Sequence, residues 1–198
     1  MLCVLAVLPQ SASAIPSGNV LVLYANGRLL PANAEFNQSL LQAVGERRDV
    51  DVTVFSEFLD APTFRGDAHE RTLATYLHDK YASQPPSVVV AAGSEALRFV
   101  VRQRGQVFPD VPVVYVSVSD ADLRRMEPLP PEYVGVPLRH DFVGTVEQAL
   151  QWRPKARHLL IVLDTTEFGR EFEERLRSES RAFAGRLDIE FMIVDSIA

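Results

Sequence analysis

The sequence predicts an α/β protein of two lobes, each built on a parallel sheet. Short, continuous apolar runs alternate with segments of helical periodicity, as in strands buried on both faces and joined by helices. A proline-rich stretch divides this series in two. The chain has 198 residues, 47% of them hydrophobic and 23% charged. These values indicate a globular protein with a substantial core and exclude a disordered tail, a collagen-like repeat and a coiled coil.

Residues 1–14 are expected to be the remnant of a signal peptide. Met1–Leu8 is an apolar run too short to span a bilayer, and Ala12 and Ala14 form the small-x-small pattern that a signal peptidase requires. The segment contains no Lys or Arg, so a basic start is missing, and a buried N-terminal strand is the alternative. Cleavage after Ala14 would remove Cys3, the single cysteine, and leave a mature chain without disulfides or cysteine metal sites.

Residues 15–125 are expected to form the N-terminal lobe. Helices are predicted after its first three strands, because apolar residues recur there at spacings of three and four. The expected strands are Val20–Tyr24, Val50–Phe55, Val88–Ala92 and Val113–Val118, and the helices carry Phe36 to Val44, Leu73 to Tyr81 and Ala96 to Val101.

Residues 126–133 are predicted to be a stiff crossover, because three prolines lie within Glu127–Glu132. Residues 134–198 are expected to form a partial second lobe. Its last strand has no following helix to cover it, so we expect the natural protein to continue beyond Ala198. The expected elements of this lobe are strands at Val134–Val136, Leu159–Leu163 and Asp188–Val194, with helices at Phe142–Leu150 and Phe168–Phe183.

Several kinds of chemistry are excluded by the sequence. The formal net charge is −6 and the basic residues are scattered, which argues against a nucleic-acid partner. No glycine-rich loop ends in Lys and Ser or Thr, and the loop after the first strand has one glycine, Gly27, so both phosphate-binding fingerprints are missing. None of the four histidines has a second His or a Cys at ligand spacing. We therefore expect no catalytic residue, no metal and no cofactor.

Ser94 lies in a strand–turn–helix segment like the nucleophile elbow of α/β hydrolases. That elbow needs glycine two positions before and after the serine, where this chain has Ala92 and Ala96. Ser94 is therefore expected to cap the helix that follows it. An α/β hydrolase-like enzyme that uses Ser94 is kept as the alternative function.

The predicted parallel sheets offer a place to bind a small molecule. In open sheets of this kind, ligands bind beyond the carboxyl ends of the strands. The loops expected there carry Tyr, Asn, Arg, Ser, Thr and Asp side chains that can form hydrogen bonds. Such residues can also be turn formers or helix caps, but binding without catalysis needs nothing more.

Several segments, in this order and spacing, resemble the uncharacterised substrate-binding components of ABC transporters. The resemblance is closest to the form found as the periplasmic sensor region of bacterial histidine kinases, and it covers most of residues 19–195. The segments that carry it are Glu57–Asp60, Lys80-Tyr81, Pro86–Gly93 with Ala96-Leu97, Phe108–Val114, Gly135-Val136, Asp141–Glu147 and Pro154.

The resemblance implies the type I periplasmic-binding-protein fold, with two Rossmann-like lobes and a ligand in a cleft that favours closure. By position, seven residues would face the ligand: Asn26, Arg28, Gly93, Ser94, Ser119, Asp141 and Thr166.

The function expected from this resemblance is a non-enzymatic, exported receptor for a small molecule. Its partner would be an ABC permease or a histidine kinase core, in the same or a neighbouring polypeptide. The location would be the periplasm, with a membrane tether in the full-length parent as a further expectation. The identity of the ligand and the existence of a dimer are left open.

Overall fold

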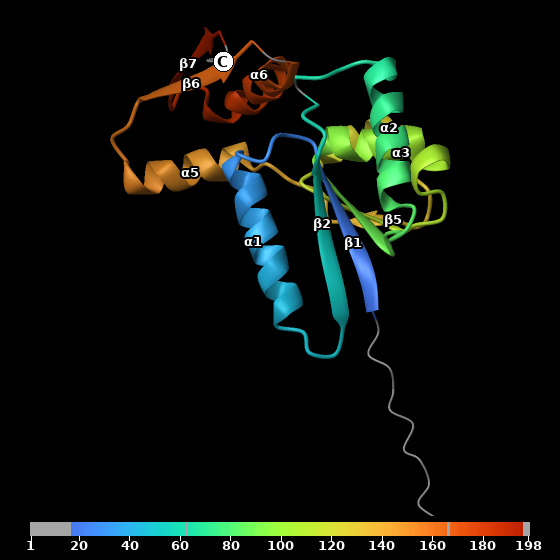
Figure 1. The fold of residues 1–198 in the computed structure, drawn as a ribbon. Coiled ribbons are helices and arrows are strands. Elements are labelled where there is room, and N and C mark those ends of the chain that lie inside the picture. Colours follow the sequence, from blue (N-terminus) through green and yellow to red (C-terminus); the bar gives the residue numbers. More distant parts are fainter. Residues whose placement is uncertain (1–16, 62, 166, 196–198) are drawn as a thin grey trace, which may run out of the picture. The chain divides into compact units, whose positions relative to one another are not determined.

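The computed structural model describes residues 17–61, 63–165 and 167–195 (Figure 1). The expected signal peptide and the predicted site residue Thr166 lie outside the described residues. The chain divides into two compact units, residues 1–138 and 139–198. Among the described helices, none is both long and apolar enough to cross a membrane.

The first unit is a five-stranded parallel sheet with helical connections. Its strands lie in the order β2-β1-β3-β4-β5, so the chain reverses direction across the sheet after β2. The elements are β1 (Ser17–Tyr24), α1 (Pro31–Gly45), β2 (Asp51–Phe58), α2 (Asp67–Tyr81), β3 (Val88–Ala92), α3 (Ser94–Val107), β4 (Val113–Val116), α4 (Asp120–Met126) and β5 (Tyr133–Gly135).

The two faces of this sheet are covered by different helices, because side chains alternate along a strand. Leu21 and Leu23 of β1 lie in the larger core cluster, together with residues of α2 and α3. Val22 and Tyr24 point the other way, into a smaller cluster with Phe36 of α1. Figure 1 shows the same arrangement, with α1 on one side of the strands and α2 and α3 on the other. All four of these β1 side chains are fully buried, which explains the continuous apolar run in the sequence.

Two predictions about the middle of the chain were wrong. The strand expected at Val134–Val136 was assigned to the second lobe, but β5 pairs with β4 in the first sheet, with Tyr133 opposite Val113. The boundary between the two compact units also falls after Leu138, later in the sequence than the expected crossover at residues 126–133. Sheet membership depends on contacts between distant segments, which a local pattern does not reveal.

The second unit contains a two-stranded parallel sheet with its helices. Phe183 of this unit is fully buried and has Phe142 edge-on at 6.1 Å between ring centres. The elements are α5 (Phe142–Trp152), β6 (His158–Asp164), α6 (Glu167–Glu179), the 3₁₀ helix η1 (Ser180–Phe183) and β7 (Asp188–Val194).

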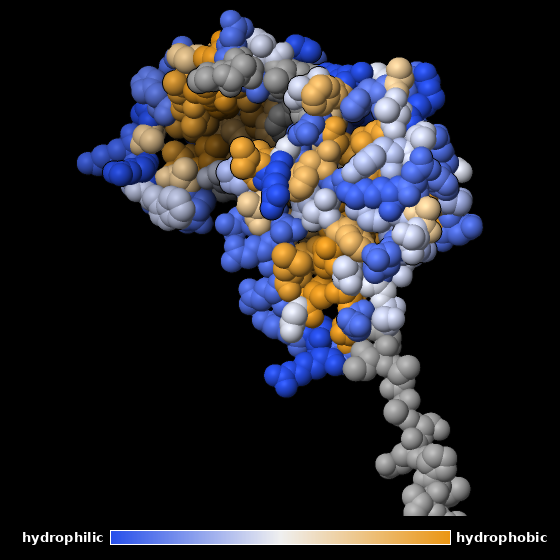
Figure 2. All heavy atoms as spheres, viewed as in Figure 1, coloured by the Kyte–Doolittle hydropathy of each residue, from blue (hydrophilic) through white to orange (hydrophobic). Residues whose placement is uncertain are grey.

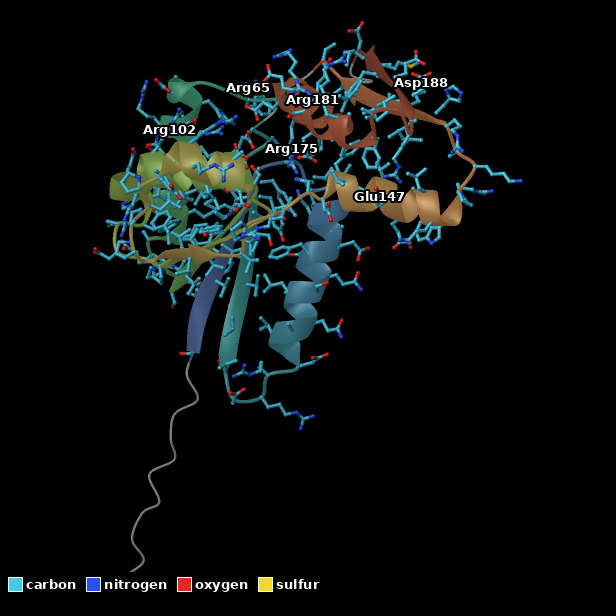
Figure 3. All side chains as sticks on the ribbon, turned by 180° about the vertical axis from the view of Figure 1, so that it is seen from behind. Arg65, Arg102, Glu147, Arg175, Arg181 and Asp188 are labelled. Atoms are coloured by element: carbon cyan, nitrogen blue, oxygen red, sulfur yellow. The ribbon has the colours of Figure 1, made fainter. Side chains whose placement is uncertain are left out.

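Arginine side chains connect the parts of the second unit. Arg186 binds the carboxylate of Glu147 on α5 through two hydrogen bonds of 2.6 and 3.0 Å. Arg175 of α6 donates to the backbone carbonyl of His140 and, at 2.6 Å, to Glu179 (Figure 3). These contacts attach α5 and the segment before it to the rest of the unit.

One face of the β6–β7 sheet carries exposed apolar side chains. Leu160 and Val162 of β6 and Met192 of β7 are 49%, 55% and 43% exposed, and Met192 pairs in register with Val162. Figure 2 shows apolar side chains on the surface of this part of the second unit. The opposite face carries Ile161, which is buried.

Candidate ligand-binding site

The loops that leave the first sheet are brought together by backbone hydrogen bonds just beyond the strands. Ala25 N–H donates to the carbonyl of Ala92 at 3.0 Å, which joins the segments after β1 and β3. Gly93 N–H donates to Val116 at 2.9 Å, which joins β3 and β4. The carboxyl ends of three adjacent strands therefore meet at one edge, where ligands bind in open α/β sheets.

Gly93 makes the turn at the centre of this edge possible. Its φ is +100°, in the region that favours glycine, and it is the N-cap residue of α3. A Cβ atom at this position would lie 2.9 Å from the Cβ of Ala25. The β3–α3 turn thus packs directly against the loop after β1, and a larger residue would force the two segments apart.

Ser94 follows Gly93 and joins a hydrogen-bonded cluster with Ser119 and Asp122. The hydroxyl of Ser94 donates to Asp122 Oδ2 at 2.6 Å, and that of Ser119 donates to the same oxygen at 2.8 Å. Ser119 Oγ also accepts from the backbone N–H of Asp122 at 3.1 Å, which makes Ser119 the N-cap of α4. All three side chains are half-buried. The expectation that Ser94 caps α3 was wrong, because Gly93 is the N-cap residue and Ser94 is already the first residue of the helix.

The carboxylate of Asp122 is held in its ionised form. Burial by itself raises the pKa of Asp122, but the hydrogen bonds from Ser94 and Ser119 and the charges of Arg125 and Arg98 outweigh it, so the pKa is lowered. Arg125 Nη1 and Arg98 Nη2 lie 3.3 and 3.7 Å from Asp122 Oδ1. The side chain of Asp122 is 18% exposed, so the carboxylate lies near the surface without being freely solvated.

Asn26 and Arg28 lie in the neighbouring loop between β1 and α1. The amide of Asn33 donates to the backbone carbonyls of Asn26 and Gly27 at 3.3 and 3.0 Å, which fixes the path of the loop. Arg28 is exposed, and its side chain has no hydrogen bond or ion pair with the residues that the structure describes. An unpaired guanidinium beside a fixed loop is available to an anionic or polar group.

The remaining predicted site residues belong to the second unit. Asp141 is the N-cap of α5, where its Oδ1 accepts from the N–H of Gly144 at 2.7 Å. Its backbone carbonyl accepts from the hydroxyl of Thr145 at 2.6 Å. Its observed contacts are therefore those of a helix cap. The other predicted residue, Thr166, lies outside the described residues.

Asp122 is the residue that the sequence prediction missed. It stands three positions after Ser119, and this Ser-x-x-acid spacing at the start of a helix is a known capping pattern. The pattern could have identified the contact with Ser119. The contact with Ser94 could not be found in this way, because 28 positions separate Ser94 and Asp122.

The cluster of Ser94, Ser119 and Asp122 is suited to hydrogen bonding and lacks the base that a serine nucleophile needs. A serine nucleophile needs a base to take its proton, usually histidine, whereas Ser94 donates to a carboxylate and no described histidine bonds to it. Within the described part of the chain, no group of three or more His, Cys, Asp or Glu residues could hold a metal ion. Hydroxyl oxygens, a half-buried acid and an exposed guanidinium can instead recognise a polar small molecule.

Solved structures of binding proteins share this fold. A ligand-free, open substrate-binding protein with adhesive properties from Clostridium difficile has a TM-score of 0.59 and 10% identity, over 90% of this chain and 58% of its own. A solute-binding protein of an ABC transporter from Rhodopseudomonas palustris, in complex with 3,4-dihydroxybenzoic acid, has a TM-score of 0.56 and 13% identity, over 90% and 47%. An ABC domain from Streptococcus pneumonia, in complex with L-Trp, has a TM-score of 0.51 and 15% identity, over 91% and 58%.

The sequence itself matches no protein-family model and no curated protein. The chain spans about half of the length of the solved structures it resembles, from 47% to 58% in these three. The likeness confirms the predicted architecture of parallel, Rossmann-like α/β units. The chain therefore has the fold of the type I periplasmic binding proteins.

Proposed function

We propose that this chain is the ligand-binding part of an exported solute receptor, and that the ligand binds at the carboxyl edge of the first sheet. The observation that carries the proposal is the half-buried cluster of Ser94, Ser119 and Asp122 at that edge. The exposed, unpaired Arg28 on the adjacent loop supplies a charge that a ligand can use. The fold shared with binding proteins supports a receptor role.

The partner and the location are further parts of the proposal. We propose a periplasmic location, and a signal or transport partner that is either an ABC permease or a histidine kinase core. In the whole receptor, the ligand would favour a closed arrangement, because a ligand shifts a conformational equilibrium through its different contacts in the two states. Small-angle scattering on the full receptor would then show a smaller radius of gyration when the ligand is bound.

A thermal-shift screen of polar small molecules tests the proposal. The library includes L-Trp and 3,4-dihydroxybenzoic acid, since two proteins of this fold are in complex with them. A compound present at a hundred times its Kd stabilises the folded state by about 2.7 kcal/mol, which raises Tm by about 5 to 10 °C for a chain of this size. If no member of a broad library raises Tm, the receptor role is contradicted.

Variants then test the position of the site. Arg28→Ala is expected to weaken the binding of such a compound about tenfold, because a charged hydrogen bond is lost. Arg153→Ala, which removes an exposed arginine from the second unit, is the matched control and should leave the Kd unchanged. Equal affinities of Arg28→Ala and the wild type would remove Arg28 from the site. Turnover of an ester panel that disappears in Ser94→Ala would instead favour the hydrolase alternative.

A further inference from the structure

The hydroxyl groups of Ser94 and Ser119 both donate their hydrogen to one oxygen atom, Asp122 Oδ2. A serine hydroxyl has a single hydrogen to donate and two lone pairs that accept. The two Oγ atoms lie 2.6 and 2.8 Å from Asp122 Oδ2, and an ionised carboxylate can only accept hydrogen bonds. Each serine must therefore direct its hydrogen at Asp122.

The two serine oxygens differ in how many further hydrogen bonds they can accept. Ser119 Oγ already accepts from the backbone N–H of Asp122, at 3.1 Å. Ser94 Oγ accepts from no described donor, so it can offer both of its lone pairs to an incoming group. A carboxylate or phosphate oxygen placed against Ser94 would meet lone pairs only, whereas an ammonium or hydroxyl group would find an acceptor.

We propose that Asp122 is a specificity-determining residue of the ligand site: by fixing the hydroxyls of Ser94 and Ser119 as acceptors, it selects a ligand group that donates hydrogen bonds. This inference rests on the proposed function. Asp122 acts through the serines and is a positioning residue. The arginines at 3.3 and 3.7 Å from Asp122 Oδ1 offset part of its charge, so the direction of the hydroxyls, in addition to the charge, decides which group is accepted.

Asp122→Asn separates hydroxyl direction from the rest of the cluster. An amide of the same shape has one oxygen that accepts and one nitrogen that donates. The arginines beside Oδ1 favour the amide oxygen at that position, so the amide nitrogen takes the place of Oδ2. Both serines then meet an N–H group and turn their own hydrogens outward. The variant should therefore accept carboxylates that the wild type rejects. Glu95→Gln is the matched control, because it removes an exposed negative charge from the first turn of α3 and leaves the serines untouched.

The test uses isotope-labelled protein and two small probes, methylammonium and acetate, at pH 7 and constant ionic strength. The Cβ resonance of Ser94 reports binding beside its hydroxyl. In the wild type, methylammonium should shift this resonance with a Kd at least tenfold lower than that of acetate. Asp122→Asn should reduce this ratio at least tenfold, and Glu95→Gln should change it less than threefold.

Other outcomes overturn the inference. These are equal binding of the two probes to the wild type, no shift with either probe, or a change in Glu95→Gln as large as in Asp122→Asn, which would be an effect of charge alone. A carbon-13 titration of the Asp122 carboxyl gives a probe-free check. Ser94→Ala should raise the pKa of Asp122, and an unchanged pKa would also overturn the inference. Selective binding of methylammonium, together with a failed ligand screen, would reject the receptor role and leave the hydroxyl geometry intact.

Discussion

At the scale of single residues, one half-buried carboxylate collects several polar contacts. Asp122 accepts from two serines on different elements and has two arginines beside it. Removing one partner of such a cluster leaves the others unsatisfied, which costs more than the contact itself contributes. The candidate site and the local stability therefore depend on the same side chain.

The lowered pKa of Asp122 predicts how its contribution changes with pH. The folded protein binds a proton at Asp122 less readily than the unfolded chain does. The ionised group therefore stabilises the fold fully above the unfolded pKa of about 3.9, and this stabilisation is lost as the pH falls through the lower folded-state pKa. Asp122→Asn should reduce the free energy of unfolding at pH 7, and its difference from the wild type should shrink below pH 4. Urea denaturation from pH 7 to pH 3 measures this, and a constant difference would contradict it.

Gly93 gives a second prediction at this scale. Gly93→Ala places a methyl group where φ is +100° and Ala25 lies 2.9 Å away, so the free energy of unfolding should fall by about 1 to 3 kcal/mol. Gly105→Ala is the control in the same helix, because a Cβ there meets nothing within 4 Å. It should stabilise the protein by about 0.5 to 1 kcal/mol through helix propensity. Chemical denaturation compares the two variants, and a loss of equal size in both would show that the turn is not constrained.

At the scale of elements, one cluster attaches the edge strand β2 to α2. Glu57 of β2 accepts from Lys80 at 2.5 Å and from Tyr81 at 2.7 Å, and its side chain is 15% exposed. Burial and the hydrogen bond to Glu57 raise the pKa of Tyr81, so its hydroxyl stays protonated and continues to donate at neutral pH. β2 pairs only with β1 in the described sheet, so these contacts supplement the hydrogen bonds that hold the strand.

Tyr81→Phe tests the contribution of this cluster. The variant keeps the buried ring and removes the donor to Glu57, so the free energy of unfolding should fall by about 1 to 2 kcal/mol. Tyr76→Phe is the control, since Tyr76 is 48% exposed and accepts from Lys80 in a solvated position. It should change stability by less than about 0.5 kcal/mol. Equal effects of the two variants in urea denaturation would show that the contact with Glu57 adds nothing.

The elements differ in how well the sequence predicted them, for physical reasons. The strand at residues 88–92 was predicted with its observed bounds, because an unbroken apolar run marks a buried strand directly. The strand at residues 188–194 was also predicted with its observed bounds, although Asp188 and Glu190 interrupt its apolar pattern. The helix α4 was missed because its seven residues are too few to show a periodic apolar face. The candidate site was likewise predicted in part. Ser94 and Ser119 could be predicted from their positions after strands, but the contact of both with Asp122 is visible only in the three-dimensional fold.

At the scale of the whole molecule, the two units are buried to different degrees. The four residues from Leu21 to Tyr24 are fully buried, and β1 is paired on both sides. Among the described residues of the second unit, β6 and β7 pair only with each other, and three large apolar side chains of their common face are 43% to 55% exposed. Local stability follows burial and pairing, so the first sheet should be the more resistant part of the chain.

Native-state hydrogen exchange tests this difference. The amides of Leu21–Tyr24 should exchange only through global unfolding, at least a hundredfold more slowly than those of Leu159–Leu163. The reason is that opening a central strand breaks two ladders and exposes a full core, whereas opening β6 breaks one. The candidate site at the carboxyl edge of the first sheet would then lie in the more stable unit. Equal protection of the two strands would contradict this account of the molecule.

The proposed function requires a small molecule to bind at the carboxyl edge of the first sheet, beside Ser94, Ser119 and Asp122. The most direct measurement is an amide chemical-shift map of the labelled protein, titrated with a compound that raises Tm in the screen. The largest shifts are expected at residues 26–28, 93–98 and 119–122, and they should saturate with the Kd that calorimetry gives for the same compound. Saturable shifts confined to other residues, with these three segments unchanged, would contradict it.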